Sequence, residues 1–425
     1  MIRLRRMLVV VTLMGLMCHL ARGVAEEEWP QFRGPTGQGI AKAHDLPVVF
    51  DDKKNVAWKV AIEGTGWSSP VIAGNQIWLT TSTDAGHSLR AICVDRAAGK
   101  VVRDIEVFAP TNPPAINAKN SYASPTPVLN DGRLFVHFGT LGTACVDCTS
   151  GSVLWRNTEV QLNHKEGPGS SPIVYEDLVI VNCDGLDVQA VVAFHQSDGK
   201  IAWRATRPGP LDSNPDFRKA YSTPLLIEVD SRTQLISPGA SRVISYDPRT
   251  GDIIWQVDYE GFSNVPRPVL GDGLLFVCTG FMKPRLLAIR PDGQGNVTDS
   301  HVAWRYTAGV PNNPSPLWVD GRLYLVSDAG VASCLDAKTG KPLWKKRLGG
   351  NYSASPLWAD GRIYICSEEG RISILSPGDT YERLAVNQLQ GRIMASPAAT
   401  GRELYIRTDA GLYCFEKSLA TAANE

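Results

Sequence analysis

Short apolar runs separated by turn-forming residues recur along the chain, and residues 312–348 show the repeating unit most clearly. Apolar runs of five or six residues bounded by glycine-containing turns predict β-strands. The predicted elements of this unit are a strand opening at Ser315-Pro316, strands over 322–327, 331–336 and 342–348, and turns at 320–321, 328–330 and 338–340. Four short antiparallel strands with a Trp in the last predict one blade of a β-propeller.

The dipeptide that opens this unit, or a related pair, occurs eight times along the chain. The pairs are Ser69-Pro70, Ser124-Pro125, Ser171-Pro172, Thr223-Pro224, Arg267-Pro268, Ser315-Pro316, Ser355-Pro356 and Ser396-Pro397. Successive prolines are separated by 40 residues (Pro316 to Pro356) to 55 residues (Pro70 to Pro125). This period is typical of four-stranded propeller blades. We therefore predict an all-β, eight-bladed propeller of four-stranded antiparallel blades.

The two ends of the chain predict how the ring closes. The eighth unit has strands over 396–399, 403–408 and 411–416 but lacks a fourth, whereas residues 55–60 read as a fourth strand with no blade before it. The N-terminal strand would complete the last blade and leave no long free edge. The predicted organisation is a signal peptide over 1–25, an N-terminal arm over 26–54, the propeller over 55–416 and a flexible tail over 417–425.

Residues 29–39, rich in Gly and Pro, should form an extended arm that Trp29 and Phe32 hold against the propeller. Arg33 within it is either solvated, as loop polar residues usually are, or contacts a ligand.

Residues that recur at one position of every repeat indicate architecture rather than chemistry. We predict that the fourth-strand residues Trp155, Trp203, Trp255, Trp304 and Trp344 pack blade against blade. Asp95, Asp147, Asp247 and Asp336 end third strands, where an Asp side chain accepts hydrogen bonds from the backbone of the following turn. The insertion over 292–299 faintly resembles a calcium loop, but it lacks the central Gly and the distal Glu and is interpreted as a polar hairpin loop.

The first 25 residues have the pattern of a signal peptide. Arg3, Arg5 and Arg6 precede an apolar core over 7–17, and small residues before Glu26 suggest cleavage near Ala25. The core is too short to span a bilayer comfortably. We therefore expect an exported protein, periplasmic or extracellular, with no transmembrane span in the mature chain.

Charge and cysteine content narrow the function classes. The chain has 43 basic and 43 acidic residues, and loss of the four arginines within 1–25 leaves a net charge of −4, which argues against nucleic-acid binding. Eight cysteines follow residue 25, most of them within apolar strands, and are interpreted as free core residues. Cys145 and Cys148 lack the further ligands of a zinc site and the helix start of a thioredoxin site.

The repeat resembles the PQQ-like repeat family, most closely over 336–344, where Asp-Ala-Lys-Thr-Gly-Lys-Pro-Leu-Trp leads into the fourth strand. The resemblance covers residues 55 to 416 and implies one of two function classes. One is the non-catalytic, BamB-type propellers of outer-membrane protein assembly. The other is the quinoprotein dehydrogenases, which oxidise alcohols or sugars with PQQ and calcium.

No Cys-Cys pair, which many of these dehydrogenases place against PQQ, occurs in the chain, and no catalytic motif is found. We therefore predict a monomeric, exported binding or protein-interaction scaffold that is not an enzyme and has no cofactor. Its partner would be an envelope protein or peptide, or an anionic small molecule. The alternative is a PQQ-dependent quinoprotein dehydrogenase of alcohols or sugars.

The candidate binding site is one mouth of the central channel. In a propeller the first strand of each blade lies nearest the axis, so the residues just before each opening dipeptide gather at one end. Convergent polar and aromatic side chains on rigid strand ends suit an anionic small molecule or an extended peptide. In the alternative interpretation these side chains hydrogen-bond one another and water. The candidates are Trp67, Lys119, Asn120, Tyr122, Lys219, Tyr221, Asn264, Arg267, Asn312, Asn313, Asn351, Tyr352 and Arg392.

Overall fold

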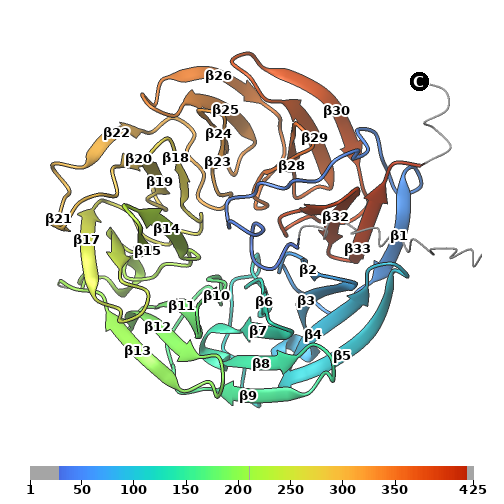
Figure 1. Cartoon of the computed structure of the whole chain (residues 1–425), viewed down its shortest axis with the longest axis horizontal. Coiled ribbons are helices and arrows are strands. Elements are labelled where there is room, and N and C mark those ends of the chain that lie inside the picture. The colour runs from blue at the N-terminus through green and yellow to red at the C-terminus, as the bar shows by residue number, and fades with distance from the viewer. Residues whose placement is uncertain (1–27, 210, 419–425) are drawn as a thin grey trace, which may run out of the picture.

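The predicted blades are eight antiparallel sheets arranged in a ring around a central axis (Figure 1). The structure is a computed structural model that describes residues 28–209 and 211–418. The predicted signal peptide and most of the predicted tail lie outside the described residues. Within each blade the first strand lies nearest the axis and the last lies at the rim, as expected (Figure 1).

The first four blades run along the chain without interruption. In order from axis to rim they comprise β2 (Val71–Ala73), β3 (Gln76–Thr83), β4 (Ser88–Asp95) and β5 (Lys100–Phe108); β6 (Val128–Asn130), β7 (Arg133–His137), β8 (Thr143–Asp147) and β9 (Val153–Asn157); β10 (Ile173–Tyr175), β11 (Leu178–Asp184), β12 (Gln189–His195) and β13 (Ile201–Thr206); and β14 (Leu225–Val229), β15 (Arg232–Gly239), β16 (Arg242–Tyr246) and β17 (Ile253–Asp258). Short 3-10 turns η1 (Asp84–Gly86), η2 (Gly139–Leu141) and η3 (Pro215–Phe217) lie in the loops.

The remaining blades follow the same order, except that the last takes its rim strand from the N-terminus. They comprise β18 (Val269–Gly271), β19 (Leu274–Cys278), β20 (Leu286–Ile289) and β22 (Val302–Tyr306); β23 (Leu317–Val319), β24 (Arg322–Val326), β25 (Val331–Asp336) and β26 (Pro342–Arg347); β27 (Leu357–Ala359), β28 (Arg362–Cys366), β29 (Arg371–Ser376) and β30 (Glu382–Gln388); and β31 (Ala398–Thr400), β32 (Glu403–Thr408), β33 (Gly411–Glu416) and β1 (Val56–Ala61).

The ring closes where β1 pairs antiparallel with β33, and this confirms the closure expected from the unpaired fourth strand. Trp58 lies opposite Cys414 and Ala61 opposite Gly411, so nearly all of β1 takes part in the ladder. Chain segments almost 360 residues apart in sequence therefore share one sheet. The predicted strand over 55–60 is shifted by a single residue from the observed one.

The recurring Trp residues pack blade against blade, as predicted. In five blades the indole N–H donates to a carbonyl of the following blade: Trp58 to Arg96, Trp155 to Gln196, Trp203 to Pro248, Trp304 to Ala337 and Trp344 to Gly378, at 2.8–3.2 Å. Four of these rings lie so close to a turn glycine of the neighbouring blade, such as Gly199 against Trp155, that a Cβ there would approach the ring to 2.3–2.7 Å. These positions therefore require glycine.

Trp255 departs from this pattern, since its indole N–H donates to Gln234 of its own blade at 2.8 Å. Residues of the insertion over 292–299 lie beside it. There β21 (Gly295–Asn296) pairs in parallel with β17 and adds a fifth strand to the fourth sheet. The predicted polar loop thus includes a short strand that covers the rim of the neighbouring blade.

The recurring Asp residues accept hydrogen bonds from turn backbones, as predicted. The Asp336 carboxylate accepts from the Thr339 N–H at 2.8 Å, and Asp147 accepts from the N–H groups of Thr149 and Ser150. Asp95 and Asp247 accept in the same way from the turns that follow them. These contacts lower the pKa of the Asp147 and Asp336 carboxyls.

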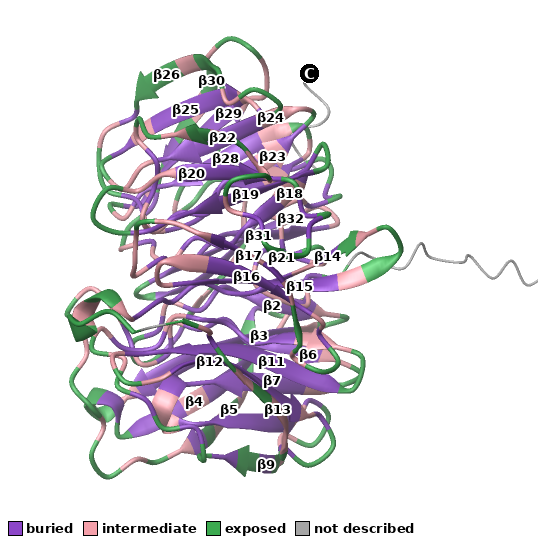
Figure 2. Ribbon diagram, turned by 90° about the vertical axis from the view of Figure 1, so that its left-hand side faces the viewer, coloured by how far each residue is buried: buried purple, intermediate pink, exposed green. Residues whose placement is uncertain are grey.

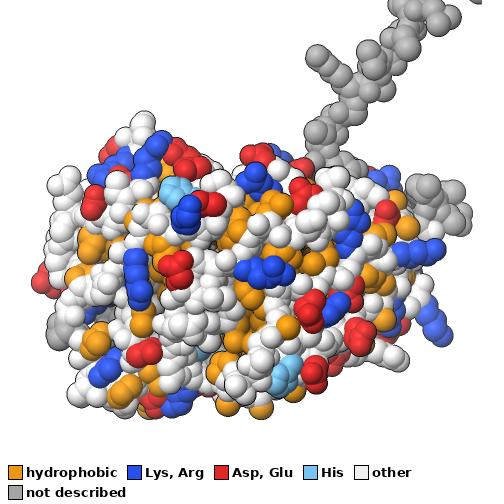
Figure 3. Space-filling view, turned by 90° about the horizontal axis from the view of Figure 1, so that it is seen from below, with side chains coloured by type: hydrophobic (Ala, Val, Ile, Leu, Met, Phe, Trp, Pro, Cys, Tyr) orange, Lys and Arg blue, Asp and Glu red, His pale blue; other side chains and the backbone are white. Residues whose placement is uncertain are grey.

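The core is divided among the blades and the interfaces between them. Figure 2 shows buried residues along the inner strands, whereas exposed residues gather in the loops and on rim strands such as β26 and β9. All eight cysteines of the described residues are free and buried, as predicted. Figure 3 shows that Lys, Arg, Asp and Glu side chains are interspersed over the side of the ring. Within 28–209 and 211–418, no helix is long and apolar enough to cross a membrane.

The N-terminal arm lies across the ring rather than along its outside, and in Figure 1 it reaches the centre of the ring. Trp29 is 1% exposed and exchanges backbone hydrogen bonds with Ile72 at 2.8 and 2.9 Å, so its predicted anchoring role is confirmed. Farther along, the Trp358 N–H donates to the Gly39 carbonyl, and the Phe50 N–H donates to the Asn387 side chain. The His44 N–H donates to the Gly401 carbonyl at 2.8 Å, so the arm ties blades one, seven and eight together.

Candidate functional site

A ring of side-chain hydroxyls surrounds the channel axis, and we call it the hydroxyl belt. Each hydroxyl oxygen accepts the backbone N–H of the equivalent residue in the preceding blade, at 2.9–3.1 Å. The belt consists of Ser69, Thr126, Ser171, Thr223, Ser315, Ser355 and Ser396. The opening dipeptide thus has a physical role, because its hydroxyl joins adjacent innermost strands that share no ladder.

In the second blade the belt residue is Thr126, two residues after the Ser124 assigned from the sequence. The sequence Ser-Pro-Thr-Pro contains two dipeptides of the right type, and only the second one opens β6. The Ser124 hydroxyl is instead engaged with Asn120 at 2.6 Å, so it belongs to the loop above the belt. The assignment of Ser124-Pro125 as the opening pair was wrong by two residues.

The belt has one interruption, at Arg267 in the fifth blade. Arginine has no hydroxyl, and the Thr223 N–H that would donate to it has no acceptor among the described residues. Arg267 is 2% exposed and its guanidinium donates to the carbonyls of Pro224 and Phe32 at 3.0 and 2.6 Å. It also donates to the Gln31 side chain at 3.2 Å. The residue that breaks the belt therefore binds the N-terminal arm.

The arm occupies one end of the channel. Its backbone and side chains bond to residues near the ends of innermost strands: Leu129 donates to Pro30, and Leu270 donates to the Gln38 side chain. Gly37 lies against the Arg267 guanidinium, where a Cβ would approach Nη1 to 2.3 Å, and its φ of +70° also favours glycine. Phe32 was expected to hold the arm against the propeller surface, but it lines the channel cavity.

The cavity has a volume of about 600 Å³. The seven belt residues and Phe32 line it, and loops of several blades form its opening. Since the arm fills the opposite end, the channel is a pocket with Phe32 at its base and the loops around its mouth. This volume suits a small molecule or the tip of a peptide.

Seven of the thirteen predicted site residues line this cavity. They are Trp67, Lys119, Asn120, Lys219, Tyr221, Asn312 and Asn313. Arg392 lies beside them, with its guanidinium 5.9 Å from the centre of the Trp67 ring. The prediction that residues before the opening dipeptides gather at one mouth thus agrees with the geometry for these positions, while their binding role stays a prediction.

The other five predicted residues are placed elsewhere. Arg267 lies beneath the belt, as described above, and Tyr352 is 0% exposed in the core between the sixth and seventh blades. The Asn264 amide donates to Tyr259 at 2.7 Å, and Asn351 donates to Glu369 at 3.0 Å. Tyr122 lines a different cavity. The residues just before the opening dipeptides therefore do not all line the channel cavity.

The positive charges at the mouth are paired with carboxylates. Lys119 Nζ lies 2.7 Å from Glu368, which also accepts from Arg392 at 3.1 Å. Lys219 Nζ lies 3.4 Å from Glu166 and 3.6 Å from Asp216. Despite its burial, the Glu368 carboxyl has a lowered pKa because Lys119, Ser353 and Arg392 stabilise its charged form. The mouth is therefore closer to neutral than the predicted residues alone suggested.

Sequence reasoning missed an apolar edge of the mouth, which we call the aromatic lip: Phe217, Phe262, Phe281 and Met282. Phe262 packs against Phe217 and Phe281, with ring centres 4.5 and 5.8 Å apart. Met282, Phe281 and Phe217 are nevertheless 64%, 49% and 36% exposed, and all four residues line the cavity. The signal in the sequence was the presence of aromatic residues within loops that otherwise hold turn residues.

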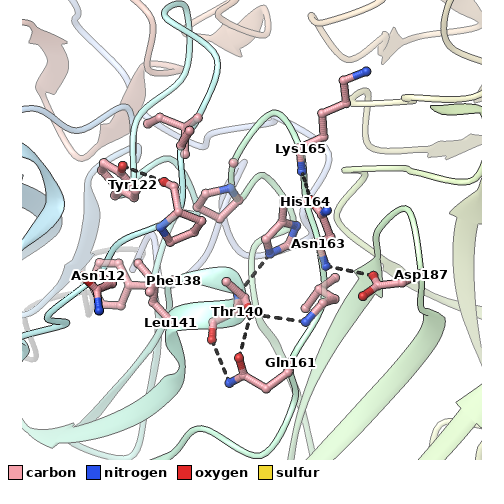
Figure 4. Close-up of a pocket in the computed structure, with 16 residues that line it drawn as sticks. Asn112, Tyr122, Phe138, Thr140, Leu141, Gln161, Asn163, His164, Lys165 and Asp187 are labelled. Atoms are coloured by element: carbon pink, nitrogen blue, oxygen red, sulfur yellow. Dashed lines mark hydrogen bonds between the residues drawn. The ribbon is translucent and has the colours of Figure 1, made fainter. Parts of the chain in front are cut away.

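A second cavity, of about 490 Å³, lies between the loops of the second and third blades (Figure 4). The Thr140 N–H donates to His164 Nε2 at 3.1 Å, and Asn163 donates to Asp187 at 2.8 Å. His164 Nδ1 is buried without a partner among the described residues. Burial lowers the pKa of His164 to about 4, so its ring is neutral at physiological pH.

Sequence comparison places the chain among known propellers. Its residues 90–256, 239–347 and 295–380 match the PQQ-like repeat family described as outer membrane protein assembly factor BamB. The chain belongs to this family. A curated relative, the tetrathionate hydrolase of Acidithiobacillus ferrooxidans, is 22% identical over 258 residues, which are 52% of this chain and 48% of the relative. The match thus spans about half the length of that relative.

Solved structures agree on the fold. A europium-containing methanol dehydrogenase has a TM-score of 0.67 at 12% identity, covering 91% of this chain and 90% of that one. The quinohemoprotein alcohol dehydrogenase of Comamonas testosteroni gives 0.65 at 12% identity, covering 92% and 80%. BamB of Moraxella catarrhalis gives 0.59 at 13% identity, covering 85% and 99%. At such identities the similarity establishes the propeller fold alone.

Proposed function

We propose that the protein is an exported binding propeller that holds an apolar segment of an envelope protein or peptide in the channel mouth. The observation that carries this proposal is the aromatic lip, which exposes Phe217, Phe281 and Met282 beside a cavity of about 600 Å³. Exposed apolar groups that border a cavity mark binding sites more often than isolated exposed residues do. Aromatic side chains and Met are also enriched in protein interfaces.

The charges around the lip fit a peptide better than a purely anionic ligand. Lys119 and Lys219 each face a carboxylate, so a partner carrying both amide groups and charges of either sign can exchange hydrogen bonds with the mouth. The Asn312 side-chain carbonyl oxygen, which has no partner among the described residues, adds an acceptor beside the cavity, while the Asn313 amide donates to Asp328. The family description, an outer membrane protein assembly factor, supports a partner from the cell envelope.

An enzyme is the second candidate, because the curated relative is a hydrolase and two solved neighbours are dehydrogenases. PQQ with calcium fits the residues of the mouth poorly. PQQ is an anionic quinone, and the cations at the mouth already face Glu166, Asp216 and Glu368. Among the described residues, no group of three or more His, Cys, Asp or Glu side chains is placed to hold a metal ion. We therefore derive no reaction step through PQQ.

The test compares capture by the full protein and by a lip variant, Phe281→Ser with Met282→Ser. Partners crosslinked from an envelope extract should be lost with the lip variant and kept with a rim control, Val102→Ser with Leu154→Ser. The control residues are exposed to a similar extent, 51% and 48%, on β5 and β9. Equal capture by both variants would exclude the lip.

A quinone absorbance band together with dye-linked alcohol oxidation, appearing only on addition of PQQ and calcium, would favour the enzyme.

A further inference from the structure

The hydroxyl belt has hydrogen-bond donors that the protein does not use. A hydroxyl has one hydrogen and two lone pairs. Each belt oxygen accepts one backbone N–H, yet no described residue accepts the hydrogen of any of the seven. The belt residues are at most 7% exposed and all line the cavity, so these hydrogens can find acceptors only there. A buried hydrogen-bond donor that is left without an acceptor lowers the stability of the protein.

Two buried arginines that contact the arm and the backbone beside the belt carry positive charge without a counter-charge, although neither of them lines the cavity itself. Arg33, next to Phe32 in the arm, is 2% exposed and donates only to the carbonyls of Gln38 and Pro316, at 2.9 and 2.7 Å. Its Nε and Nη1 have no partner among the described residues. Arg267, close enough to act on the charge of Arg33, donates to carbonyl and amide oxygens and to no carboxylate.

Burial acts on both arginines in the same direction. It lowers the pKa of each to about 9, and for Arg33 the neighbouring charge of Arg267 contributes as well. Both guanidinium groups still carry their charge at neutral pH. A buried charge normally has a partner or a counter-ion. These two charges beside the belt have no carboxylate partner, whereas the cations of the mouth are paired with carboxylates.

Water alone can satisfy the belt hydroxyls, but it does not compensate two adjacent buried cations. An anionic oxygen group does both, because it accepts several O–H hydrogen bonds and carries negative charge. The Thr223 N–H, which has no acceptor in the described part of the chain where Arg267 interrupts the belt, adds a further donor. The unused hydroxyl donors and the buried positive charge thus both favour an anionic group with several oxygen acceptors.

We propose that the hydroxyl belt, above Arg33 and Arg267, is an oxyanion-binding subsite for a carboxylate, phosphate or sulfonate group. This inference rests on the proposed binding function and names the chemical group that reaches the base of the pocket. The group is either the charged end of the ligand held at the mouth or a free inorganic oxyanion.

The probes are sulfate, inorganic phosphate, acetate and tetrathionate, titrated against the full protein at constant ionic strength. The variant Thr126→Val with Thr223→Val removes two belt hydroxyls at nearly constant shape, whereas Thr126→Ser with Thr223→Ser keeps them. We expect about tenfold weaker binding for the Val variant and unchanged binding for the Ser variant. Equal binding by both variants would overturn the proposal.

A second measurement does not depend on the variants folding. Selenate soaked into crystals of the unaltered protein should give an anomalous signal within hydrogen-bond distance of the belt hydroxyls. A signal at Lys119 or Lys219 instead, or water alone on the axis, would overturn the subsite.

Sulfate binding that survives in the lip variant Phe281→Ser with Met282→Ser would indicate a free inorganic oxyanion. Oxyanion-ended peptides that bind only when the lip is intact would indicate the end of a larger ligand. Because the lip and the belt are tested by different substitutions, the subsite can fail while the proposed binding function stands.

Discussion

Arg267 Nη1 donates a hydrogen bond to the Phe32 carbonyl at 2.6 Å, and this contact joins residues 235 positions apart in the sequence. It connects the one blade that lacks a belt hydroxyl to the arm that closes the channel. A hydroxyl at this position is too short to span from the belt to the arm, whereas arginine reaches the arm with two donors, Nη1 to Phe32 and Nη2 to Gln31. The blade that interrupts the hydroxyl belt is thus the blade whose Arg267 binds the N-terminal arm at the end of the channel.

We expect Arg267→Met to destabilise the protein and release the arm. The change leaves the buried carbonyls of Phe32 and Pro224 without donors, at a cost of about 2–3 kcal/mol, partly offset by the loss of an uncompensated buried charge. Thermal unfolding should show a lower Tm, and limited proteolysis should cut within residues 28–54. Arg305→Met, at an exposed rim position, is the control and should change neither. An arm that stays protected in Arg267→Met would contradict this role.

Ring closure should depend on β1 more than on the arm. A protein beginning at residue 55 keeps the β1 ladder and the Trp58 contact with the Arg96 carbonyl, but loses the N-terminal arm. A protein beginning at residue 62 leaves β33 as an exposed edge. We expect a moderately lower Tm for the first and a loss of more than about 5 kcal/mol, or no folding, for the second. Equal melting temperatures for the second truncation and the full protein would exclude closure by β1.

Local pattern was enough to predict the blades, because glycine turns and apolar runs recur with every unit. It was also enough for the Asp turns, which depend on neighbouring residues within a repeat, and for the closure at β1, because the last unit lacks a fourth strand and residues 55–60 read as a strand without a blade. Which side chains surround the channel mouth depends instead on the paths of the loops. The carboxylate of Glu368 and the ring of Phe281 come from connections between strands, whose paths are set by tertiary contacts that no repeat pattern records.

Arg267 is a residue that the repeat pattern placed at the channel mouth and the structure does not. Its position before Pro268 predicted a side chain at the channel mouth, alongside Lys119 and Arg392. The side chain instead runs into the protein toward an arm that lies far away in sequence. Replacing Arg267 together with Lys119 and Arg392 would therefore confuse lost binding with lost stability, so the mouth and the base need separate variants.

Stability should fall as the pH is lowered from about 6.5 toward 4, in part because of His164. The pKa of its ring is lowered from 6.5 to about 4 by burial, so in this window the unfolded chain binds a proton that the folded chain does not. His137, lowered to about 3, acts in the same direction. One such proton contributes at most about 1.4 kcal/mol per pH unit.

The measurement is denaturant unfolding of the protein and of His164→Gln at pH 7 and pH 4.5. The Gln side chain reaches the position of Nε2 and can still accept from the Thr140 N–H, but it does not titrate, so the variant should lose less stability between the two pH values. His87→Gln, at an exposed position, controls for the removal of any histidine and should follow the unaltered protein. The same pH slope in all three would show that His164 does not contribute.

The cysteines should be unreactive until the protein unfolds. All eight in the described residues are buried, and burial raises the pKa of thiols such as Cys93, Cys145 and Cys366 to about 12. Because the thiolate is the reactive form, alkylation at pH 8 should be negligible in the native state. Mass spectrometry after iodoacetamide treatment should find almost none of these eight cysteines modified in native protein and all eight modified in guanidinium-unfolded protein. Prompt labelling of Cys148, 5% exposed beside the second blade's turn, would show instead that this edge opens locally in the folded state.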